Sequence, residues 1–399
     1  MIASPSSNSS THAQNPLKIA IIGAGPGGLT LACLLQQKGI PATVYERETS
    51  SKERPQGGTL DLHVESGQRA IKEAGLWPQI EKILRHEGED FKLLDKAAFP
   101  HINFENPEGQ GERPEIDRLQ LREVLLDSIN PESIKWGHSL LKVEPGKDGK
   151  HNLHFHDKVI EGFDLVVGAD GAWSKVRPLL TEVLPYYSGI SMVEVKFTDV
   201  DTKQPKISKL VGRGSMFAAG DNKALIAQRN GDGSVKVYVT LRVPEKYLKE
   251  CGINFSDPQD ARNGLLKHFE DWNQELKDLI VLCDDNFIPR PLYMLPVGHS
   301  WDSKPGVTLL GDAAHLMTPF AGEGVNLAML DALELAEQIA NNKNGLNAAI
   351  ECYEKEMFPR AEEKARETLS NLEICFTHDA PRQFKEIMLS HGSPPEEAQ

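Results

Sequence analysis

The chain has 399 residues, of which 39% are hydrophobic and 26% are charged, a composition typical of a folded globular protein. Its formal net charge of −14 disfavours nucleic acid and anionic membranes as partners, and no apolar run reaches the roughly 18 residues that a membrane-spanning helix needs. The five cysteines are scattered, with neither a CxxC pair nor a metal-ligand spacing, so we expect reduced thiols, a cytoplasmic location and no bound metal.

In chain order, residues 1–16 come first. They are rich in Ser, Asn and Thr, and they lack the basic start and the apolar stretch of a signal peptide. This composition predicts a disordered tail, so we expect the folded part to begin near residue 17.

The first chemical motif is a β-turn-α-β unit. An apolar run over 18–22 predicts a buried strand, and it leads into a glycine-rich turn with Gly23, Gly25 and Gly28. Gly23 permits the tight turn, Gly25 lets a pyrophosphate approach the backbone, and Gly28 lets the helix and the strand pack closely. The helix that follows, closed by Gly39, would present its free N–H groups and its positive dipole end to the phosphates.

A carboxylate completes this unit. Glu46 follows a second β-rich run over 42–45, and it lies about 20 residues after Gly23, the spacing of a ribose-binding acid. An acid at this place disfavours a 2′-phosphate, so the site should hold FAD or NAD rather than NADP. The alternative is a glycine turn without a ligand, which the combination of strand, helix and acid disfavours.

Two later segments also combine a buried strand with an acidic residue in the turn that follows it. Residues 163–168 predict a buried strand that runs into a turn at Asp170, and residues 307–310 predict another that runs into Asp312. Asp312 would lie at the carboxyl end of a strand, where open α/β sheets bind ligands. Glycines over 319–326 then leave backbone N–H groups free at the start of a helix, where negative charge is stabilised. Because the glycine-rich turn that begins at Gly23 and the segment that contains Asp312 are two nucleotide-type elements far apart in the sequence, we expect one discontinuous domain with an insertion.

The predicted insertion spans 183–283. Glycine-bounded runs that alternate in polarity, with turn signals such as 230–233, predict an antiparallel sheet. A helix should follow over 265–282, and 346–376 is largely helical by composition. Core packing is the ordinary role of aromatic side chains in such a sheet.

The ordered motifs resemble the class A flavoprotein monooxygenases, the family typified by para-hydroxybenzoate hydroxylase. They are the glycine-rich turn, the Asp-Gly motif at 168–177 and the Gly-Asp motif at 311–326, and the resemblance covers about 17–360. It implies an α/β fold, in which a Rossmann-like (GR2-type) FAD-binding domain carries an inserted antiparallel β-sheet substrate domain and a C-terminal bridging helix. The implied boundaries are 17–182 and 284–344 for the FAD-binding domain, 183–283 for the substrate domain, and 345–399 for the C-terminal helix and tail.

Within that family the chain is most similar to the tetracycline-inactivating monooxygenases, through segments 44–47, 57–63, 114–122 and 311–322. The resemblance implies that Glu46 binds the ribose, that Asp312 holds the ribityl and pyrophosphate region, and that 319–326 cradles the isoalloxazine. Asp170 would serve both FAD and NAD(P)H. The full set of implied cofactor-binding residues is Gly23, Gly25, Gly28, Glu46, Arg47, Gly58, Asp61, Arg118, Arg122, Asp170, Asp312, Pro319, Gly322, Gly324, Val325 and Asn326.

The chain also departs from these relatives. Glu323 and Thr318 stand where the family has Gln and Pro. A carboxylate aimed at anionic reduced flavin would cost energy, so we expect Glu323 to point away or to pair with a base. His63, taken alone, is more often a structural histidine than a catalyst.

Tetracycline binding does not carry over by position. Glu194, Ser215 and Lys236 stand where the relatives have their polar substrate contacts, and none of the three matches. We nevertheless keep them, with three apolar neighbours, as candidates for the substrate pocket. These candidates are Glu194, Ser215, Met216, Phe217, Lys236 and Phe320.

The resemblance implies a reaction in which NADPH or NADH reduces FAD, O2 forms a flavin C4a-hydroperoxide, and an oxygen atom passes to an aromatic or polycyclic phenolic molecule, tetracycline-like compounds included. The flavin carries this chemistry, so we name no catalytic side chain. We expect a monomer. Two alternatives stay open: a flavin oxidase or dehydrogenase without oxygen insertion, and a non-catalytic flavin-binding protein.

Overall fold

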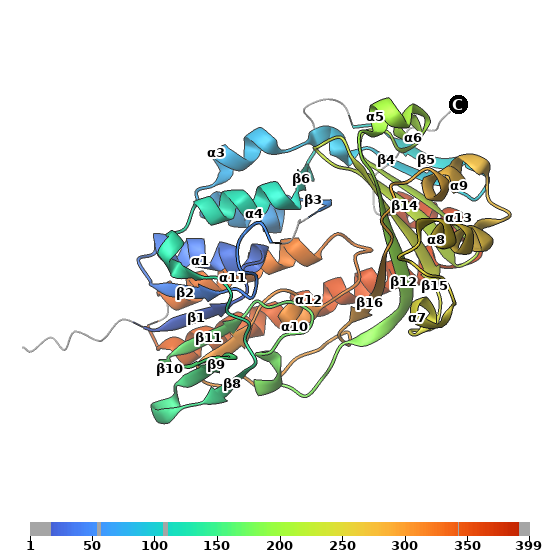
Figure 1. Cartoon of the computed structure of the whole chain (residues 1–399). Coiled ribbons are helices and arrows are strands. Elements are labelled where there is room, and N and C mark those ends of the chain that lie inside the picture. Colours follow the sequence, from blue (N-terminus) through green and yellow to red (C-terminus); the bar gives the residue numbers. More distant parts are fainter. Residues whose placement is uncertain (1–16, 54–56, 107–110, 342, 391–399) are drawn as a thin grey trace, which may run out of the picture.

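The computed structural model describes residues 17–53, 57–106, 111–341 and 343–390, and the tail predicted at 1–16 lies outside these ranges. Figure 1 shows two halves, one built on a parallel sheet and the other on a larger, mostly antiparallel sheet. No helix in the described ranges combines the length and the apolar character needed to cross a bilayer.

The parallel sheet has five strands in the order β17-β11-β1-β2-β7, and every neighbouring pair is parallel. Its central strands are buried along their whole length, as expected for a sheet covered by helices on both faces. The strands predicted from the four apolar runs are therefore confirmed. The five strands of the parallel sheet are β1 (Ile19–Ile22), β2 (Ala42–Tyr45), β7 (Ile134–Lys135), β11 (Leu165–Gly168) and β17 (Val307–Leu309).

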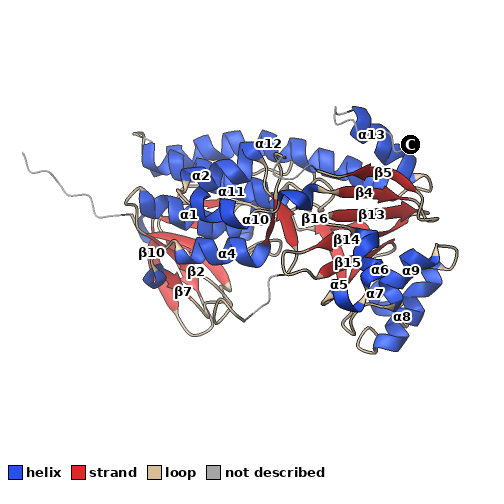
Figure 2. Cartoon of the chain, turned by 90° about the horizontal axis from the view of Figure 1, so that it is seen from above, coloured by secondary structure: helices blue, strands red, loops and turns tan. Residues whose placement is uncertain are grey.

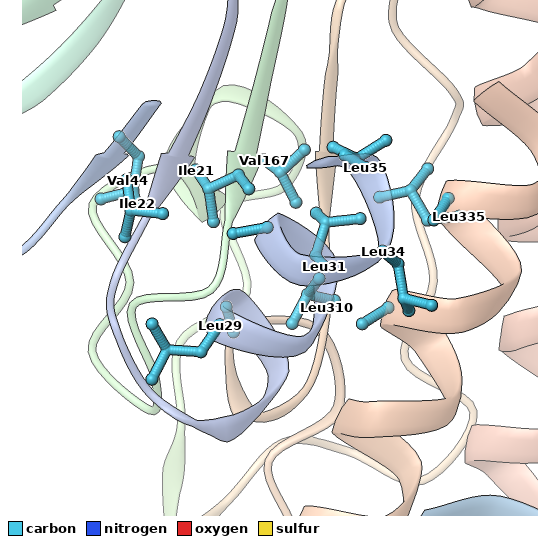
Figure 3. Packing of buried hydrophobic residues seen from close by; sticks show 14 of the residues in the cluster. Ile21, Ile22, Leu29, Leu31, Leu34, Leu35, Val44, Val167, Leu310 and Leu335 are labelled. Carbon is cyan, nitrogen blue, oxygen red and sulfur yellow. The ribbon is translucent and has the colours of Figure 1, made fainter. Parts of the chain in front are cut away.

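Two helices from distant parts of the chain pack together beside this sheet. They are α1 (Pro26–Gln37) and α11 (Gly324–Asn341). Leucines of α1 lie against Leu310 and Leu335, which Figure 3 shows. The approach is close because Gly27 has no side chain: a Cβ there would lie 2.7 Å from Leu310 Cδ1 and 3.0 Å from the Ala328 carbonyl oxygen.

The second sheet has seven strands in the order β16-β12-β15-β14-β13-β4-β5. Only β4 and β13 run parallel to each other. The predicted insertion supplies four central strands, but three more come from outside residues 183–283, so the sheet extends beyond the range we predicted. The strands are β4 (Phe91–Leu94), β5 (Pro100–Phe104), β12 (Tyr186–Phe197), β13 (Ser215–Gly220), β14 (Lys223–Arg229), β15 (Val235–Arg242) and β16 (Ile288–Met294).

Side chains alternate between the two faces of this sheet. One face, which we call the outer face, carries Val193, Val195 and Val237 and packs in one core with Leu265 and Phe269. The helix predicted over 265–282 is broken into two helices joined by a 3₁₀ turn. The helices of this half are α5 (Val200–Lys203), α6 (Pro205–Val211), α7 (Tyr247–Glu250), α8 (Pro258–Leu266) and α9 (Gln274–Val281).

The predicted bridging helix is present as α12 (Leu346–Cys375). Figure 2 shows it running along both halves. Its first part, with Tyr353, is buried in the core of the parallel half, and its last part, with Leu372, is buried against the second sheet. The final helix, α13 (Ala380–Ser390), is not foreseen in the sequence, and its Phe384 stacks on Phe217 with ring centroids 5.9 Å apart. These features confirm the α/β fold class.

Smaller elements complete the described chain. A two-stranded ribbon of β3 and β6 lies between the two halves (Figure 1), and a three-stranded antiparallel sheet has the order β10-β9-β8. The bounds are β3 (Thr59–Asp61), β6 (Glu115–Asp117), β8 (Lys142–Pro145), β9 (His151–His154), β10 (Val159–Phe163), α2 (Arg69–Glu73), α3 (Trp77–Ile80), α4 (Arg118–Asp127) and α10 (Asp312–His315).

Candidate active site

The three motifs meet along one edge of the parallel sheet. Strands β17, β11 and β1 are neighbours, and at their carboxyl ends stand Asp312, Asp170 and Gly23. Glu46 follows the end of the next strand, β2. The topology therefore brings together four residues that the sequence predicted as cofactor ligands, at the edge where open α/β sheets bind ligands.

The glycine-rich turn has the geometry that a phosphate site needs. Gly23 has φ +110°, and a Cβ there would lie 2.4 Å from the Ala169 carbonyl oxygen. A Cβ on Gly28 would lie 2.2 Å from the Gly23 carbonyl oxygen. Gly25 caps α1 without any side-chain hydrogen bond, and no atom would come within 4 Å of a Cβ placed on it. The start of α1 thus combines uncapped N–H groups with open space, which fits a pyrophosphate.

Glu46 is buried beside this turn. Its Oε2 accepts a hydrogen bond of 2.7 Å from the Ala24 N–H, and its Oε1 accepts one of 3.0 Å from the Glu48 N–H. Each carboxylate oxygen has a further lone pair, so these bonds orient the side chain and leave it able to accept from a ribose hydroxyl.

Arg122 supports the same turn from within the protein. It is 2% exposed, its Nη2 lies 2.8 Å from Glu48 Oε2, and its Nε donates to the Ala24 carbonyl oxygen at 3.2 Å. Its place is therefore beside the glycine turn, where it fixes the loop backbone. Arg47 is exposed, as an arginine that reaches a ligand would be.

Arg118 begins α4 and is exposed. Its backbone N–H donates to the Gly58 carbonyl oxygen at 3.0 Å, so these two predicted residues are adjacent. The positive charge of Arg118 acts on Asp312. Asp312 is exposed, and desolvation by the protein around it raises the pKa of its carboxyl.

Asp170 has one satisfied and one unsatisfied oxygen. Oδ2 accepts from the Lys175 N–H at 2.7 Å, while Oδ1 is buried without a partner among the described residues. Burial raises the pKa of this carboxyl. Arg177, which is 3% exposed, donates to the Ala313 carbonyl oxygen at 3.2 Å and so ties the Asp-Gly motif to the Gly-Asp motif.

The Gly311 turn is fixed by three charged side chains, of which Asp331 and His315 are buried and Arg360 is half-buried. Asp331 Oδ2 accepts from the Gly311 N–H at 3.0 Å and lies 2.6 Å from His315 Nε2. Its Oδ1 lies 3.0 Å from Arg360 Nη2 on α12. Burial by itself raises the pKa of Asp331, but the charges of His315 and Arg360 hold it below its usual value. The ionised carboxylate therefore anchors the strand end that presents Asp312.

The loop over 319–326, which we call the cofactor loop, is attached to the end of β3 by one side chain. Asn326 is fully buried, and its Nδ2 donates to the carbonyl oxygens of Asp61 and Gly322 at 2.9 and 3.2 Å. Its Oδ1 accepts from the His63 N–H at 3.0 Å. Three predicted residues, Asp61, Gly322 and Asn326, are thereby brought together, and Gly324 and Val325 follow at the start of α11.

Glu323 pairs with bases, as we expected. Its Oε1 lies 2.6 Å from Lys364 Nζ on α12, and its Oε2 lies 3.5 Å from His63 Nδ1. Although burial raises its pKa, His63 and Lys364 lower the pKa overall. His63 is fully buried, which alone lowers its pKa, but the hydrogen bond with Asp61 and the nearby Glu323 carboxylate raise it to about 9. His63 is therefore an imidazolium at neutral pH.

The face of the seven-stranded sheet opposite the outer face carries a charged cluster, and we call it the inner face. Glu194 Oε1 lies 2.7 Å from Lys236 Nζ, and its Oε2 lies 2.5 Å from Arg290 Nε. Lys236 reaches the other half of the molecule, because a Cβ on Gly57 would lie 2.9 Å from its Nζ. Burial, followed by the charge of Glu194, raises the pKa of the neighbouring Tyr238 hydroxyl to about 12.

Phenylalanines occupy another part of the inner face. Phe217 and Phe320 lie in one cluster, and the Phe320 ring is 5.3 Å from that of Phe376. Ser215 lies two residues before Phe217 on β13 and therefore shares its face. Met216 points to the outer face and is fully buried in the core there, so our expectation that it lines the pocket is wrong. One residue changes the face because side chains alternate along a strand.

Comparison with known proteins decides the family. The FAD binding domain family matches residues 16–246 and 300–368, well over half of the chain. The monooxygenase asqM of Emericella nidulans is 34% identical over 94% of this chain and 99% of its own length. The chain is a class A FAD-dependent monooxygenase.

Two further relatives define how close the likeness is. The monooxygenase penA of Penicillium thymicola is 32% identical over 94% of this monooxygenase and 98% of its own length. The solved structure of the tetracycline destructase Tet(55) matches with a TM-score of 0.73 over 96% of this chain and 99% of that one, at 19% identity. That identity shows a shared fold alone, so the special likeness to tetracycline-inactivating enzymes is not supported beyond the fold.

These relatives also decide between the alternatives. A monooxygenase inserts oxygen, so the flavin oxidase, the dehydrogenase and the non-catalytic binder are set aside. The residues of this monooxygenase fit FAD: the open, uncapped start of α1, the unpartnered Oδ1 of Asp170 and the exposed Arg118 supply donors and acceptors where a dinucleotide needs them. Among the described residues, no group of three or more His, Cys, Asp or Glu side chains is arranged to hold a metal.

The structure adds functional residues that the sequence did not single out. Asp331 and Arg360 fix the Gly311 turn, Arg177 joins two motifs, and Lys364 compensates Glu323 together with His63, which the sequence had singled out. Asp331 gave a signal, because it is an acid in the middle of an apolar helical pattern. The other contacts depend on which helices pack together, which no local pattern reveals.

Proposed function

We propose that this monooxygenase uses NAD(P)H and O2 to hydroxylate an aromatic or polycyclic small molecule, bound between the cofactor loop and the inner face of the seven-stranded sheet. The observation that carries the proposal is the division of the inner face into a phenylalanine-lined part and a charged part. Aromatic rings pack favourably on phenylalanine, and charged groups orient a polar substituent.

The proposed division of labour at the cofactor follows the site. The start of α1 binds the pyrophosphate through its N–H groups, Glu46 accepts from the ribose, and Asp312 binds the ribityl region. The cofactor loop holds the ring system, and Asn326 keeps that loop in place. Bound FAD supplies hydride acceptance from NAD(P)H and transfer of an oxygen atom derived from O2.

At the substrate, Phe217 and Phe320 would position the rings and exclude water, while Lys236 and Arg290 would hold a phenolic or other electron-rich oxygen. Glu194 already pairs with both cations and leaves the cluster with an excess of positive charge. A phenolate would be favoured in this field over the neutral phenol, and a phenolate is the more nucleophilic partner for an electrophilic oxygen.

The proposal includes the division into an FAD-binding part over 17–182 and 284–344 and a substrate part over 183–283, extended by β4, β5 and β16. All five cysteines are free thiols, which suits the proposed cytoplasmic monomer.

The experiment measures NADPH and NADH consumption by the purified holoenzyme with a panel of polyphenols and tetracyclines, followed by turnover under ¹⁸O2. We expect an aromatic phenol to accelerate flavin reduction and its product to carry one labelled oxygen, whereas its saturated cyclohexanol analogue should do neither. Consumption of NAD(P)H that yields only hydrogen peroxide, across the whole panel, would contradict the proposed substrate class.

A further inference from the structure

Four charged side chains form a row between the end of β3, the cofactor loop and α12, and the two inner members of the row are buried. Asp61 Oδ2 lies 2.7 Å from His63 Nε2, His63 Nδ1 lies 3.5 Å from Glu323 Oε2, and Glu323 Oε1 lies 2.6 Å from Lys364 Nζ. We call these four residues the charge row. Negative and positive members alternate, so each inner member stands between two groups of opposite charge.

The row is built into the fold. The side chain of His63 is fully buried and that of Glu323 is 4% exposed, while the outer members are 28% and 26% exposed. Three separate segments supply it: the end of β3, the cofactor loop and α12. The other charged groups that act on His63 are Glu65, whose Oε1 is 4.0 Å from Nδ1, and Arg113.

The charge row lies beside the loop that is proposed to hold the cofactor, so its charges can act on the flavin. Glu323 belongs to the loop that is proposed to hold the flavin ring, and Asp61 lies against Gly322, where a Cβ would be 3.0 Å from Asp61 Oδ1. Charges in a poorly hydrated site act strongly on any charge that develops nearby. Two uncompensated carboxylates would destabilise the anionic form of a reduced flavin, whereas uncompensated cations would stabilise it.

We propose that His63 is a positioning residue that balances the two carboxylates beside the cofactor loop and thereby sets the reduction potential of the bound flavin. The inference rests on the proposed placement of the flavin ring against residues 319–326. The His63 side chain is fully buried, so it acts through Asp61 and Glu323 rather than on substrate.

The test is the midpoint potential of the flavin in the holoenzyme, measured by spectroelectrochemistry at pH 7.5 without substrate. His63→Gln and Lys364→Gln each remove a positive charge and should lower the potential. Glu323→Gln removes a negative charge and should raise it. The double variant H63Q/E323Q removes one charge of each sign and should return the potential toward that of the unaltered protein.

A purely structural role of these residues would not shift the midpoint potential in opposite directions, because loosening of the loop would shift the potential of all variants the same way. Potentials that shift in one common direction, or that do not shift at all, would overturn the proposal. Should His63→Gln fail to fold, Lys364→Gln and Glu323→Gln still decide the sign, since they act at the outer part of the row. Arg366→Gln is the matched control, because Arg366 lies on α12, as Lys364 does, in an exposed ion pair with Glu362. The flavin midpoint potential of this variant should be unchanged.

The potential is measured in the absence of substrate, so its outcome is independent of which molecule is hydroxylated. A failure of the panel with ¹⁸O2 would overturn the proposed substrate class and leave the opposite shifts intact. Unchanged potentials in an active hydroxylase would overturn the role of His63 alone.

Discussion

The carboxyl edge of the parallel sheet and the inner face of the seven-stranded sheet carry function in different ways. At the edge, the residues lie in loops, where Gly23, Asp170 and Asp312 each stand at the end of a strand. On the inner face, they lie within strands. Glu194, Lys236 and Phe217 share one surface only because their strands pair in one sheet. A loop motif is local in sequence because backbone geometry demands it, whereas a sheet face is assembled from alternate residues of several strands.

The largest expected effect tests the edge. Asp312→Ala should give largely colourless protein, because the exposed carboxylate at the start of α10 is proposed to hold the cofactor's ribityl and pyrophosphate region. The absorbance of the purified variant at the flavin bands measures the retained FAD. Asp302→Ala, which removes an exposed carboxylate away from the edge, should stay yellow. Full FAD occupancy in Asp312→Ala would remove the assignment of Asp312.

The next effect is on stability. Arg122→Ala should lower the free energy of unfolding by about 3 kcal/mol, because it breaks the buried ion pair with Glu48 and removes the hydrogen bond to the Ala24 carbonyl oxygen. Urea unfolding measures the change, and the exposed Arg366→Ala should stay within about 0.5 kcal/mol of the unaltered protein. If Arg122→Ala also lowers the free energy of unfolding by no more than about 0.5 kcal/mol, the glycine turn is held by backbone geometry alone.

The pH dependence of stability tests the junction between the two regions. The pKa of His63 is raised from 6.5 to about 9 in the folded state, so its stabilising effect is fully present below pH 6.5 and is lost as the pH rises through 9. The shift corresponds to about 3 kcal/mol at most. The difference in unfolding free energy between the unaltered protein and His63→Gln, measured from pH 6 to pH 10, should therefore shrink as the pH rises. A difference that is constant with pH would show that His63 is neutral.

The smallest effect tests the inner face with two neighbouring residues. Phe217→Leu should raise the KM for an aromatic substrate about fivefold, the loss expected when a ring contact is removed. Met216→Leu should leave KM unchanged, because Met216 lies on the outer face. Steady-state kinetics of both variants supply the comparison. Equal changes in KM would mean that the two faces are not functionally distinct.

The same contrast explains what could be predicted from the sequence. The β1-α1-β2 unit, the strand before Asp170 and the strand before Asp312 were foreseen because apolar runs and glycines are local signals. From the cost of an unpaired carboxylate we expected Glu323 either to point away or to pair with a base, and the structure shows the pairing, with Lys364 and His63.

The rest depends on tertiary contacts. Strands β4 and β5 are short and were not distinguished from the surrounding α/β chain, although they pair at the edge of the second sheet. Arg122 was expected to bind the cofactor, and its buried contacts with Glu48 and the Ala24 carbonyl oxygen depend on the packing of α4 beside α1. Met216 was placed on the wrong face because period-2 alternation does not reveal which face meets the cofactor.

A crystal structure of the holoenzyme with a bound phenolic ligand tests this arrangement most directly. We predict the pyrophosphate at the start of α1, the flavin ring against residues 319–326, and the ligand between that ring and Phe217, with its oxygen toward Lys236. A flavin ring that lies away from the cofactor loop, or a ligand that binds on the outer face of the seven-stranded sheet, would contradict it.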